Sequence, residues 1–592
     1  MCGIAGLIQY DRPGHESLPA IRTMLQHLRH RGPDDEGTTA LSSAALGNVR
    51  LSFFDRAHGT QPMSDPARRW WITYNGEVYN YRALRAELAD DWDFQSDSDT
   101  EVVLAAIVTW GPAALDRFNG MFAFFVWDDL TQTGFAARDR LGVKPFAYLP
   151  QRNRFLFASE AKALLPFLPG QPRPNFDGIT EYLAAPYFSG VEHATFEGIH
   201  YLPAGHWLRI TREGYESQAW WDWSPPDQFE SDSAHLTPLL AEHITSSVGH
   251  TLTGEYTCAV FLSGGLDSSL IAAVAAQKSE HPISAYTIQF ADQEIFDYPQ
   301  SRIVRSDDTP HARAIAESLG LELQLVPVSR ESLASDLARL AAINDALPAW
   351  EQELAQHHLS RVSSRSHRVV LVGDAADETH YGYSFLLDPE ATASPCGILE
   401  RFGPAPFARH LGTDVIDLLD TRYRELATDA GYSWETPHDR LLATTYLIVK
   451  RWLPRLLHNG DIHTMAFSLE ARVPFADTTL IELARRVHPD LGKRDGEEKH
   501  LLRNAARGFV PETQRLRRKS ALPKDQQSAA IYQVEARRAL RESRDFLSAW
   551  LDLDAIEPLL ASTRRLSENE RSLLFRIISL HHWCIAFGVT TP

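Results

Sequence analysis

Residues 261–269, Phe-Leu-Ser-Gly-Gly-Leu-Asp-Ser-Ser, combine the groups that a phosphate site needs. They lie between an apolar run, 258–260, and a stretch with helical character, 270–276. Paired glycines let the backbone approach a ligand closely, and free N–H groups at a helix N-terminus attract an anion. The Asp267 carboxylate fits such a site only if a cation such as Mg²⁺ joins it to the phosphates. The predicted phosphate-binding residues are Leu262, Ser263, Gly264, Gly265, Asp267, Ser268 and Ser269.

A plainer interpretation is a glycine turn that enters an ordinary helix with serine caps. It would account for a lone Ser-x-Gly but not for the whole string.

A second acidic loop, Gly373-Asp374-Ala375-Ala376-Asp377-Glu378, follows the apolar run 368–372. From residue 236 onward, helical patterns alternate with such short runs, which predicts a parallel sheet wrapped by helices. Ligands of these sheets bind beyond the carboxyl ends of the strands, so both loops should face one pocket. We expect Gly373 and Asp374 to contact ATP, and Asp377 to complete a two-carboxylate Mg²⁺ site with Asp267.

At the other end of the chain, a cysteine is the second residue of a strand-like start, residues 1–8. Methionine is readily removed before so small a residue, which would leave the Cys2 thiol beside its own free amine. An α-amino group has a pKa near ~8, so part of it is an unprotonated base at neutral pH. Cys2 is therefore a candidate nucleophile, although a small strand residue is the plainer interpretation.

Four later stretches support the nucleophile: His30-Arg31-Gly32-Pro33-Asp34, Arg50-Leu51-Ser52, Asn75-Gly76-Glu77-Val78-Tyr79-Asn80 and Ser98-Asp99-Thr100-Glu101. In this set and order they resemble the class II glutamine amidotransferase domain over about residues 1–210. The resemblance implies an α+β N-terminal-nucleophile hydrolase sandwich, with two packed sheets between helices. It also implies that Cys2 cleaves glutamine through a γ-glutamyl thioester and releases ammonia.

The same resemblance assigns the glutamine site. Arg50 would bind the α-carboxylate through its fork of donors, while Asp99 and Glu77, with Gly76, hold the ammonium end. Asn75 and the Gly76 N–H would form the oxyanion hole. A solvated ion pair is the plainer interpretation of Arg50 or Asp99 taken alone.

The second half resembles the ATP-pyrophosphatase domain of asparagine synthetase B, over about residues 236–530. Matching stretches are 469–477 (Leu-Glu-Ala-Arg-Val-Pro-Phe-Ala-Asp), 498–503 (Glu-Lys-His-Leu-Leu-Arg) and 518–520 (Arg-Lys-Ser). Those enzymes adenylate a carboxylate, release pyrophosphate, and let ammonia attack the acyl-adenylate. By this resemblance Lys499 stabilises charge at the α-phosphate, although a solvated lysine at a helix start is its plainer interpretation, and Asp374 lies in the acyl pocket. The implied substrates are glutamine, ATP and a carboxylic acid, with Mg²⁺ as cofactor and an internal tunnel for ammonia.

We expect a glutaminase domain at 1–210, a connector at 211–235, and a synthetase domain at 236–592 with a parallel α/β sheet and a helical C-terminal part. A net charge of −19 disfavours nucleic acid and anionic membranes as partners. Four scattered cysteines and the lack of a long apolar run predict a cytoplasmic protein. A homodimer is compatible with these features.

The sequence departs from the family pattern at three places that bear on the identity of the acceptor acid. The bacterial asparagine synthetase has a Thr-Thr-x-Arg run that holds aspartate, and an ungapped count back from Gly373 places Leu347-Pro348-Ala349-Trp350 there. This weakens aspartate as the acceptor, unless the register shifts. The segment 292–305 is longer than the corresponding segment of the family, and it is either a functional loop beside the pocket or an inert surface insertion. Residues 457–461 replace a lysine-containing run of the family.

Three function classes stay open. The first is a glutamine-dependent ligase that makes asparagine or the amide of a specialised metabolite. The second is an intramolecular amide-forming cyclase of the β-lactam synthetase or lasso-peptide cyclase type, which would have no use for Cys2, Arg50, Asn75 and Asp99. The third is a non-catalytic assembly protein, which would not need both active-site constellations.

Overall fold

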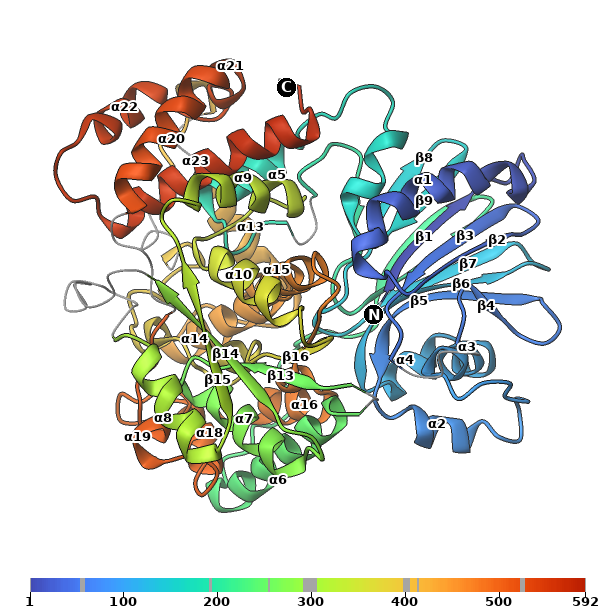
Figure 1. Cartoon of the computed structure of the whole chain (residues 1–592), viewed down its shortest axis with the longest axis horizontal. Coiled ribbons are helices and arrows are strands. Elements are labelled where there is room, and N and C mark those ends of the chain that lie inside the picture. The colour runs from blue at the N-terminus through green and yellow to red at the C-terminus, as the bar shows by residue number, and fades with distance from the viewer. Residues whose placement is uncertain are drawn as a thin grey trace.

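The computed structural model describes residues 2–53, 59–190, 194–253, 256–290, 306–397, 405–411, 415–521 and 528–590. Two antiparallel six-stranded sheets stack in the N-terminal half (Figure 1). The first contains, in spatial order, β10 (His200–Tyr201), β8 (Ala147–Gln151), β9 (Arg154–Ala158), β1 (Cys2–Ile8), β3 (Ala44–Arg50) and β2 (Asp35–Ala40). The second contains β12 (Gly214–Ala219), β11 (His206–Thr211), β7 (Thr133–Arg138), β6 (Gly120–Asp128), β5 (Trp70–Val78) and β4 (Met63–Ser64).

Strand β1 shows why this half is a layered sandwich. All seven of its residues are buried. Ala5 and Leu7 pack with the buried side chains of α1 (Leu18–Leu28), whereas Ile4 and Ile8 pack with those of β6, between the sheets. Helix α3 (Asp99–Trp110), with α2 (Tyr81–Glu87) and α4 (Ala114–Arg117) beside it, covers the second sheet. The predicted N-terminal-nucleophile sandwich is confirmed.

Strand β12 lies inside the segment that we expected to be an irregular connector. Residues 214–219 pair with β11, from Thr211 opposite Gly214 to His206 opposite Ala219. All six residues of β12 are exposed, so no apolar alternation marks this edge strand in the sequence. The second sheet therefore extends to Ala219.

The second half is built on a five-stranded sheet in which every pairing is parallel, as predicted. Its spatial order is β15 (Glu322–Val328), β14 (Ser284–Phe290), β13 (Cys258–Phe261), β16 (Val369–Leu371) and β17 (Glu470–Arg472). From β13 the chain adds β14 and β15 on one side of β13, and then returns to add β16 and β17 on the other side. The loops after β13 and β16 therefore diverge at a topological switch point, where such sheets bind ligands.

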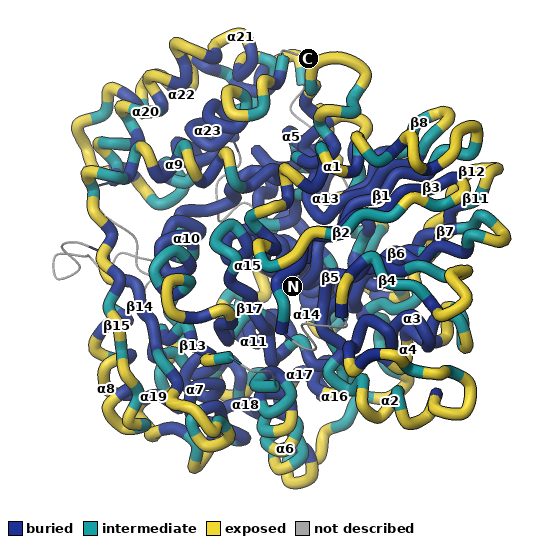
Figure 2. Tube along the Cα trace, turned by 45° about the vertical axis from the view of Figure 1, so that its right-hand side comes forward, coloured by how far each residue is buried: buried dark blue, intermediate teal, exposed yellow. Residues whose placement is uncertain are grey.

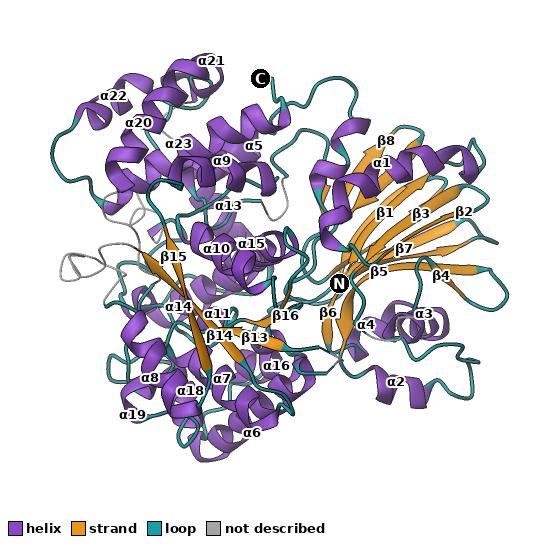
Figure 3. Cartoon of the chain, in the orientation of Figure 1, coloured by secondary structure: helices purple, strands orange, loops and turns teal. Residues whose placement is uncertain are grey.

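Helices surround this sheet and extend beyond it (Figure 3). Those of the sheet region are α6 (Ser233–Thr251), α7 (Leu266–Lys278), α8 (Thr309–Leu319), α10 (Gln352–Ser363), α11 (Ala376–Thr379), α16 (Thr478–Arg486), α17 (Pro489–Gly492), α18 (His500–Ala505) and α19 (Glu512–Arg515). The others are α5 (Phe176–Ala184), α9 (Leu333–Ile343), α13 (Val415–Asp429), α14 (Pro437–Leu447), α15 (Leu453–Met465), α20 (Ser528–Glu542), α21 (Arg544–Leu547), α22 (Leu553–Ala561) and α23 (Glu568–Phe587), and α9 packs with α20 and α23. Within the described residues, no helix is long and apolar enough to cross a membrane.

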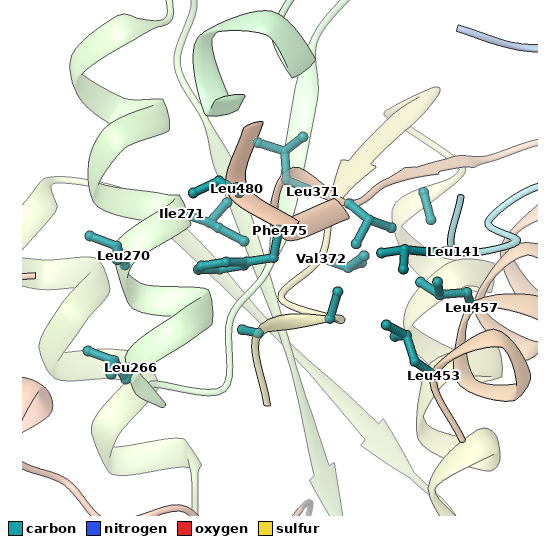
Figure 4. Close-up of a cluster of buried hydrophobic side chains, with 14 of the residues drawn as sticks. Leu141, Leu266, Leu270, Ile271, Leu371, Val372, Leu453, Leu457, Phe475 and Leu480 are labelled. Carbon is teal, nitrogen blue, oxygen red and sulfur yellow. The ribbon is translucent and has the colours of Figure 1, made fainter. Parts of the chain in front are cut away.

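The two halves share one apolar core. Leu141 of the first half packs with Val372, Leu453 and Leu457 of the second (Figure 4). The start of β1 lies at this boundary, close to β5 and β17, in a largely buried region (Figure 2). The two candidate sites therefore lie on either side of a largely buried interface between the halves.

The C-terminal helices also span both halves. From α23, the Trp583 indole N–H donates to the Asp345 carbonyl at 3.2 Å, and its ring lies 4.8 Å from that of Phe196. The Arg576 guanidinium donates to the carbonyl of Leu183 in α5. The helical C-terminal part thus fixes the relative position of the two halves.

Candidate active sites

Sheet register places Cys2 directly opposite Arg50, on the adjacent strands β1 and β3. Both residues are buried, at 5% and 6% exposure. The Cys2 backbone N–H donates to Asn75 Oδ1 of β5 at 3.0 Å, so the nucleophile candidate is held from the second sheet as well. Burial raises the pKa of the Cys2 thiol, while the positive charge of Arg50 opposes that shift. The structure therefore brings Cys2, Arg50 and Asn75 together, as the sequence predicted.

Asn75 has the geometry of an oxyanion-hole donor. Its Oδ1 accepts from Cys2, which orients the amide so that Nδ2 is the free end. That Nδ2 is buried and has no hydrogen-bond partner among the described residues. A Cβ on the next residue, Gly76, would lie 2.3 Å from the Met121 carbonyl oxygen, so only glycine permits this approach of β5 to β6. A buried unpartnered donor beside a thiol is suited to negative charge that appears only during reaction.

Asp99 and Glu77 are both buried near this thiol, but in different surroundings. Asp99 Oδ2 accepts from the Tyr74 hydroxyl at 2.8 Å and from the Val78 N–H at 3.2 Å. Glu77 Oε1 instead lies 3.5 Å from the Arg472 guanidinium of β17, in the other half. Burial raises the pKa of each carboxyl group. Glu77 therefore lies at the interface between the two halves, where it pairs with Arg472. The resemblance did not indicate this position.

The loop after β13 forms the predicted cradle at the N-terminus of α7. Gly264 has φ +67°, and a Cβ there would lie 2.5 Å from the backbone of α8 at Ala312. The Ser263 and Ser268 hydroxyls lie 3.1 Å apart, and the Gly265 N–H donates to Ser263 Oγ at 3.3 Å. Hydroxyls and N–H groups thus converge where a helix N-terminus favours an anion.

The loop after β16 brings the second carboxylate to this cradle. Lys499 Nζ lies 2.5 Å from Asp267 Oδ2 and 2.5 Å from Asp377 Oδ1. Lys519 also forms an ion pair with Asp377. Burial opposes ionisation of Asp377, but the charges of Lys499 and Lys519 outweigh it and hold its pKa well below the usual range. The predicted carboxylate pair exists, and two lysines neutralise it.

Gly382 makes room for this ion cluster. A Cβ at Gly382 would lie 2.1 Å from Asp377 Oδ1 and 2.3 Å from Lys499 Cε. The other predicted acid of the loop, Asp374, is not part of the cluster, and burial raises its pKa to about 6. Asp374 therefore differs electrostatically from Asp377, only three positions away.

The donor set at the cluster suits a hard cation. Carboxylate oxygens are the ligands that Mg²⁺ prefers, and Asp267 Oδ1 is buried with no hydrogen-bond partner among the described residues. The described residues contain no group of three or more His, Cys, Asp or Glu side chains suited to a metal. A cation here would therefore need most of its ligands from a substrate, as in nucleotide sites.

A cavity of about 270 Å³ joins the two loops. Its phosphate end includes Ser263, Asp267 and Lys519. The remaining wall is mostly aromatic, apolar or neutral, and includes Trp350, Gln352, Gln356, Leu359, Tyr383 and Leu456. Among the described lining residues, Lys519 is the only cation and there is no arginine.

Trp350 is held in this wall by residues outside it. Its backbone N–H and that of Ala349 donate to Glu353 Oε1, at 3.3 and 2.5 Å. The ring of Tyr187, from the first half of the chain, lies 5.0 Å from that of Trp350 and 4.4 Å from that of Trp452, stacked on both. The run 347–350 thus presents an indole at the position where the resemblance predicts an aspartate clamp.

Several site residues were not assigned from the sequence. Gln61 is one of them, and its Nε2 lies 4.0 Å from Cys2 Sγ. Lys519 is another: it belongs to the stretch 518–520 that carries the family resemblance, but the sequence assigned it no role. Tyr187 reaches Trp350 from a distant part of the chain, so no local pattern indicates it, whereas Glu353 lies only three positions after Trp350. The segment 292–305 lies outside the described residues.

Each half of the chain matches a family model. Residues 1–221 match the family model described as a glutamine amidotransferase domain, and residues 239–585 match asparagine synthase. Asparagine synthetase (glutamine-hydrolyzing) 3 of Bacillus subtilis is 29% identical, over 95% of this chain and 93% of its own length. Amidase chry2 of Gibberella zeae is 28% identical, over 86% of this chain and 87% of its own length.

Among solved structures, a glutamine phosphoribosylpyrophosphate amidotransferase from B. subtilis aligns with a TM-score of 0.28 at 16% identity, over 55% of this chain and 66% of its own. Since the asparagine synthase model alone covers more than half of the residues, the chain belongs to the asparagine synthase family of glutamine-dependent amide ligases, which use ATP as a substrate.

Proposed function

We propose that this enzyme hydrolyses glutamine at Cys2 and passes the ammonia to an acyl-adenylate formed in the cavity between the loops after β13 and β16. The products are a carboxamide, AMP and pyrophosphate. The observation that carries the proposal is the Asn75 Nδ2 donor, which has no partner among the described residues although its amide is bonded to Cys2, since a protein that needs no ammonia has no use for such a site. This is also the reason to rank an intramolecular amide-forming cyclase second.

In the first site, the Cys2 thiol attacks the glutamine carboxamide, and its own amine, exposed after removal of Met1, is the base. Asn75 Nδ2 and the Gly76 N–H stabilise the oxyanion. Arg50 binds the α-carboxylate of glutamine, and Asp99 its ammonium group. Glu77 supports the ammonium end from the interface, where burial raises the pKa of its carboxyl group and the Arg472 guanidinium opposes that shift.

In the second site, the ATP phosphates occupy the cradle formed by Leu262, Ser263, Gly264, Gly265, Ser268 and Ser269, beside Gly373. Mg²⁺, when bound, would be held by Asp267 and Asp377 and would neutralise phosphate charge. Lys499 lies 2.5 Å from both carboxylates, which supports a role for its ammonium group in stabilising charge that develops at the α-phosphate. Asp374, which lines the same cavity, would lie in the acyl pocket.

The acceptor that this cavity favours is a carboxylic acid larger or less charged than aspartate. An α-amino dicarboxylate needs a cationic fork for its second carboxylate, whereas the described wall offers Trp350, Tyr383 and two glutamine amides. Aromatic and amide groups suit a planar or apolar acid with neutral hydrogen-bonding groups. We therefore propose amidation of a specialised metabolite over asparagine synthesis.

We further propose that 1–210 and 236–592 are the glutaminase and synthetase domains, joined by 211–235, and that ammonia crosses their shared core. A cytoplasmic location fits the use of ATP and four cysteines that form no disulfide. A homodimer is compatible with this arrangement.

Steady-state kinetics with a panel of acids test the acceptor. Pyrophosphate release is measured with ATP, Mg²⁺ and each acid, with glutamine or ammonium as nitrogen source. Aspartate should give a kcat/KM well below the usual enzyme range of ~10⁴ M⁻¹s⁻¹ and above. Asparagine formation within that range would identify an asparagine synthetase with a differently built pocket.

A further inference from the structure

Arg31 connects the backbone of Cys2 to both halves of the molecule. Its guanidinium is fully buried, and Nε donates to the Cys2 carbonyl oxygen at 3.1 Å. One terminal nitrogen donates to Glu160 at 2.7 Å, and the other donates to Asp461 Oδ2, also at 2.7 Å. Glu160 belongs to the first half, but Asp461 belongs to α15 of the second. The carbonyl of the nucleophile residue is thus bonded to a side chain that the other domain orients.

Asp461 is itself held on two sides. It is 3% exposed, and Lys144 Nζ lies 3.5 Å from its second oxygen, Oδ1. Glu160 has further partners, since Lys162 Nζ lies 2.6 Å from one of its oxygens and His30 Nε2 lies 3.0 Å from the other. Asp461 therefore supplies a negative charge that Arg31 and Lys144 share across the interface.

The same turn of α15 borders the acceptor cavity. A Cβ on Gly460 would lie 3.3 Å from Gln356 Nε2 and 3.8 Å from Asp374 Oδ2, and both of those residues line the cavity. Two adjacent residues of α15 thus have different neighbours: Gly460 lies beside the acceptor cavity, and Asp461 bonds to the Arg31 side chain that holds the Cys2 carbonyl.

We infer that Asp461 is a positioning residue for glutamine hydrolysis: through Arg31 it fixes the Cys2 carbonyl, and with it the thiol relative to the Asn75 amide. Glutamine hydrolysis at Cys2 then depends on the contact between the two domains. A displacement of about 1 Å at a reacting group can cost ~10²-fold in rate. Loss of the Asp461 contact, one of the three hydrogen-bonded contacts that hold the Arg31 guanidinium, is therefore sufficient for a measurable defect. This inference rests on the proposed function.

The test compares Asp461→Ala with Asn119→Ala in the full-length protein. Asn119 also bridges the halves, since it donates to Asp477 at 2.8 Å and accepts from the Thr478 N–H at 3.0 Å, but no described contact joins it to Cys2. Asp461→Ala should lower kcat for glutamate release by ~10- to 10²-fold while KM for glutamine changes little. Ammonium-driven pyrophosphate release should stay within about twofold of wild type, and Asn119→Ala should leave both activities near wild type.

A second variant, Asp461→Asn, retains an acceptor oxygen for Arg31 and so guards against misfolding of the alanine variant. Its kcat for glutamine should fall between wild type and Asp461→Ala. Wild-type glutamate release from both Asp461 variants would overturn the inference, and so would an equal loss of glutamine-driven and ammonium-driven activity, because that result assigns Asp461 to the fold. Failure of the proposed function is distinguishable, since the wild-type protein would then release no glutamate at all.

Discussion

The polar groups around Cys2 and those around Asp267 are organised in opposite ways. In the N-terminal half, Asn75 presents an unpartnered amide beside the thiol, held by the backbone bond to Cys2. In the C-terminal half, Lys499 bridges the two carboxylates that would hold a metal. Under the proposed function, the first site would be preorganised for its transition state, whereas the second would exchange lysine–carboxylate contacts for contacts to ATP and a cation. We expect the first to be sensitive to any loss of geometry and the second to depend on which charges are present.

The largest effect should come from Cys2→Ala. Because the thiol serves only the first site, glutamine-dependent synthesis should fall by at least ~10⁴-fold, while synthesis from added ammonium continues. Glutamate release and product formation are measured in parallel with each nitrogen source. Glutamate release that persists in this variant would remove Cys2 from its role.

Asp267→Asn and Asp377→Asn should have the opposite selectivity. Each removes one carboxylate of the proposed Mg²⁺ site, which should reduce pyrophosphate production by ~10³-fold, equivalent to several kcal/mol. Glutamine cleavage should survive, since no described contact joins these residues to Cys2. Adenylation at the wild-type rate in either variant would contradict the two-carboxylate site.

Asn75→Ala sharpens the claim that the first site is preorganised. Removal of one oxyanion donor should lower kcat for glutamate release by ~10²- to 10³-fold, with a smaller change in KM for glutamine. Loss of the bond to the Cys2 N–H adds to this effect. If KM rises and kcat is retained, Asn75 is a ground-state binding residue instead.

Lys499→Ala tests how the second site uses its lysine, with a smaller expected effect of about 10²-fold in kcat. A cation that stabilises charge developed during adenylyl transfer appears in turnover more than in ATP affinity. The variant also leaves Asp377 paired with Lys519, so the cluster retains one cation. An unchanged kcat with a raised KM for ATP would make Lys499 a binding residue.

Local patterns predicted the parallel sheet and both strand-end loops, whereas the layered sandwich of the first half was implied by the family resemblance. Gly264 is an example: a turn before a helix with φ +67° requires a residue without a Cβ, and the glycine pair indicates it directly. Strand β12 was expected as connector because its six exposed residues have no apolar alternation.

The unpredicted part of the site lies mostly across the interface. Glu77 contacts Arg472 and Arg31 contacts Asp461, over sequence separations that no spacing rule covers. Tyr187 likewise reaches Trp350 only because the C-terminal helices fix the two halves together. Such contacts follow from the docking of two domains, so they appear only in the assembled structure.

Nitrogen transfer from glutamine tests the central claim most directly. An acid that elicits pyrophosphate release is incubated with ATP, Mg²⁺ and glutamine labelled with ¹⁵N at the amide, in the presence of unlabelled ammonium. We expect a carboxamide that carries the label in the wild-type enzyme, and only unlabelled carboxamide with Cys2→Ala. Carboxamide from the wild-type enzyme that carries no label at all, or pyrophosphate release without any carboxamide, would contradict the coupling of the two sites.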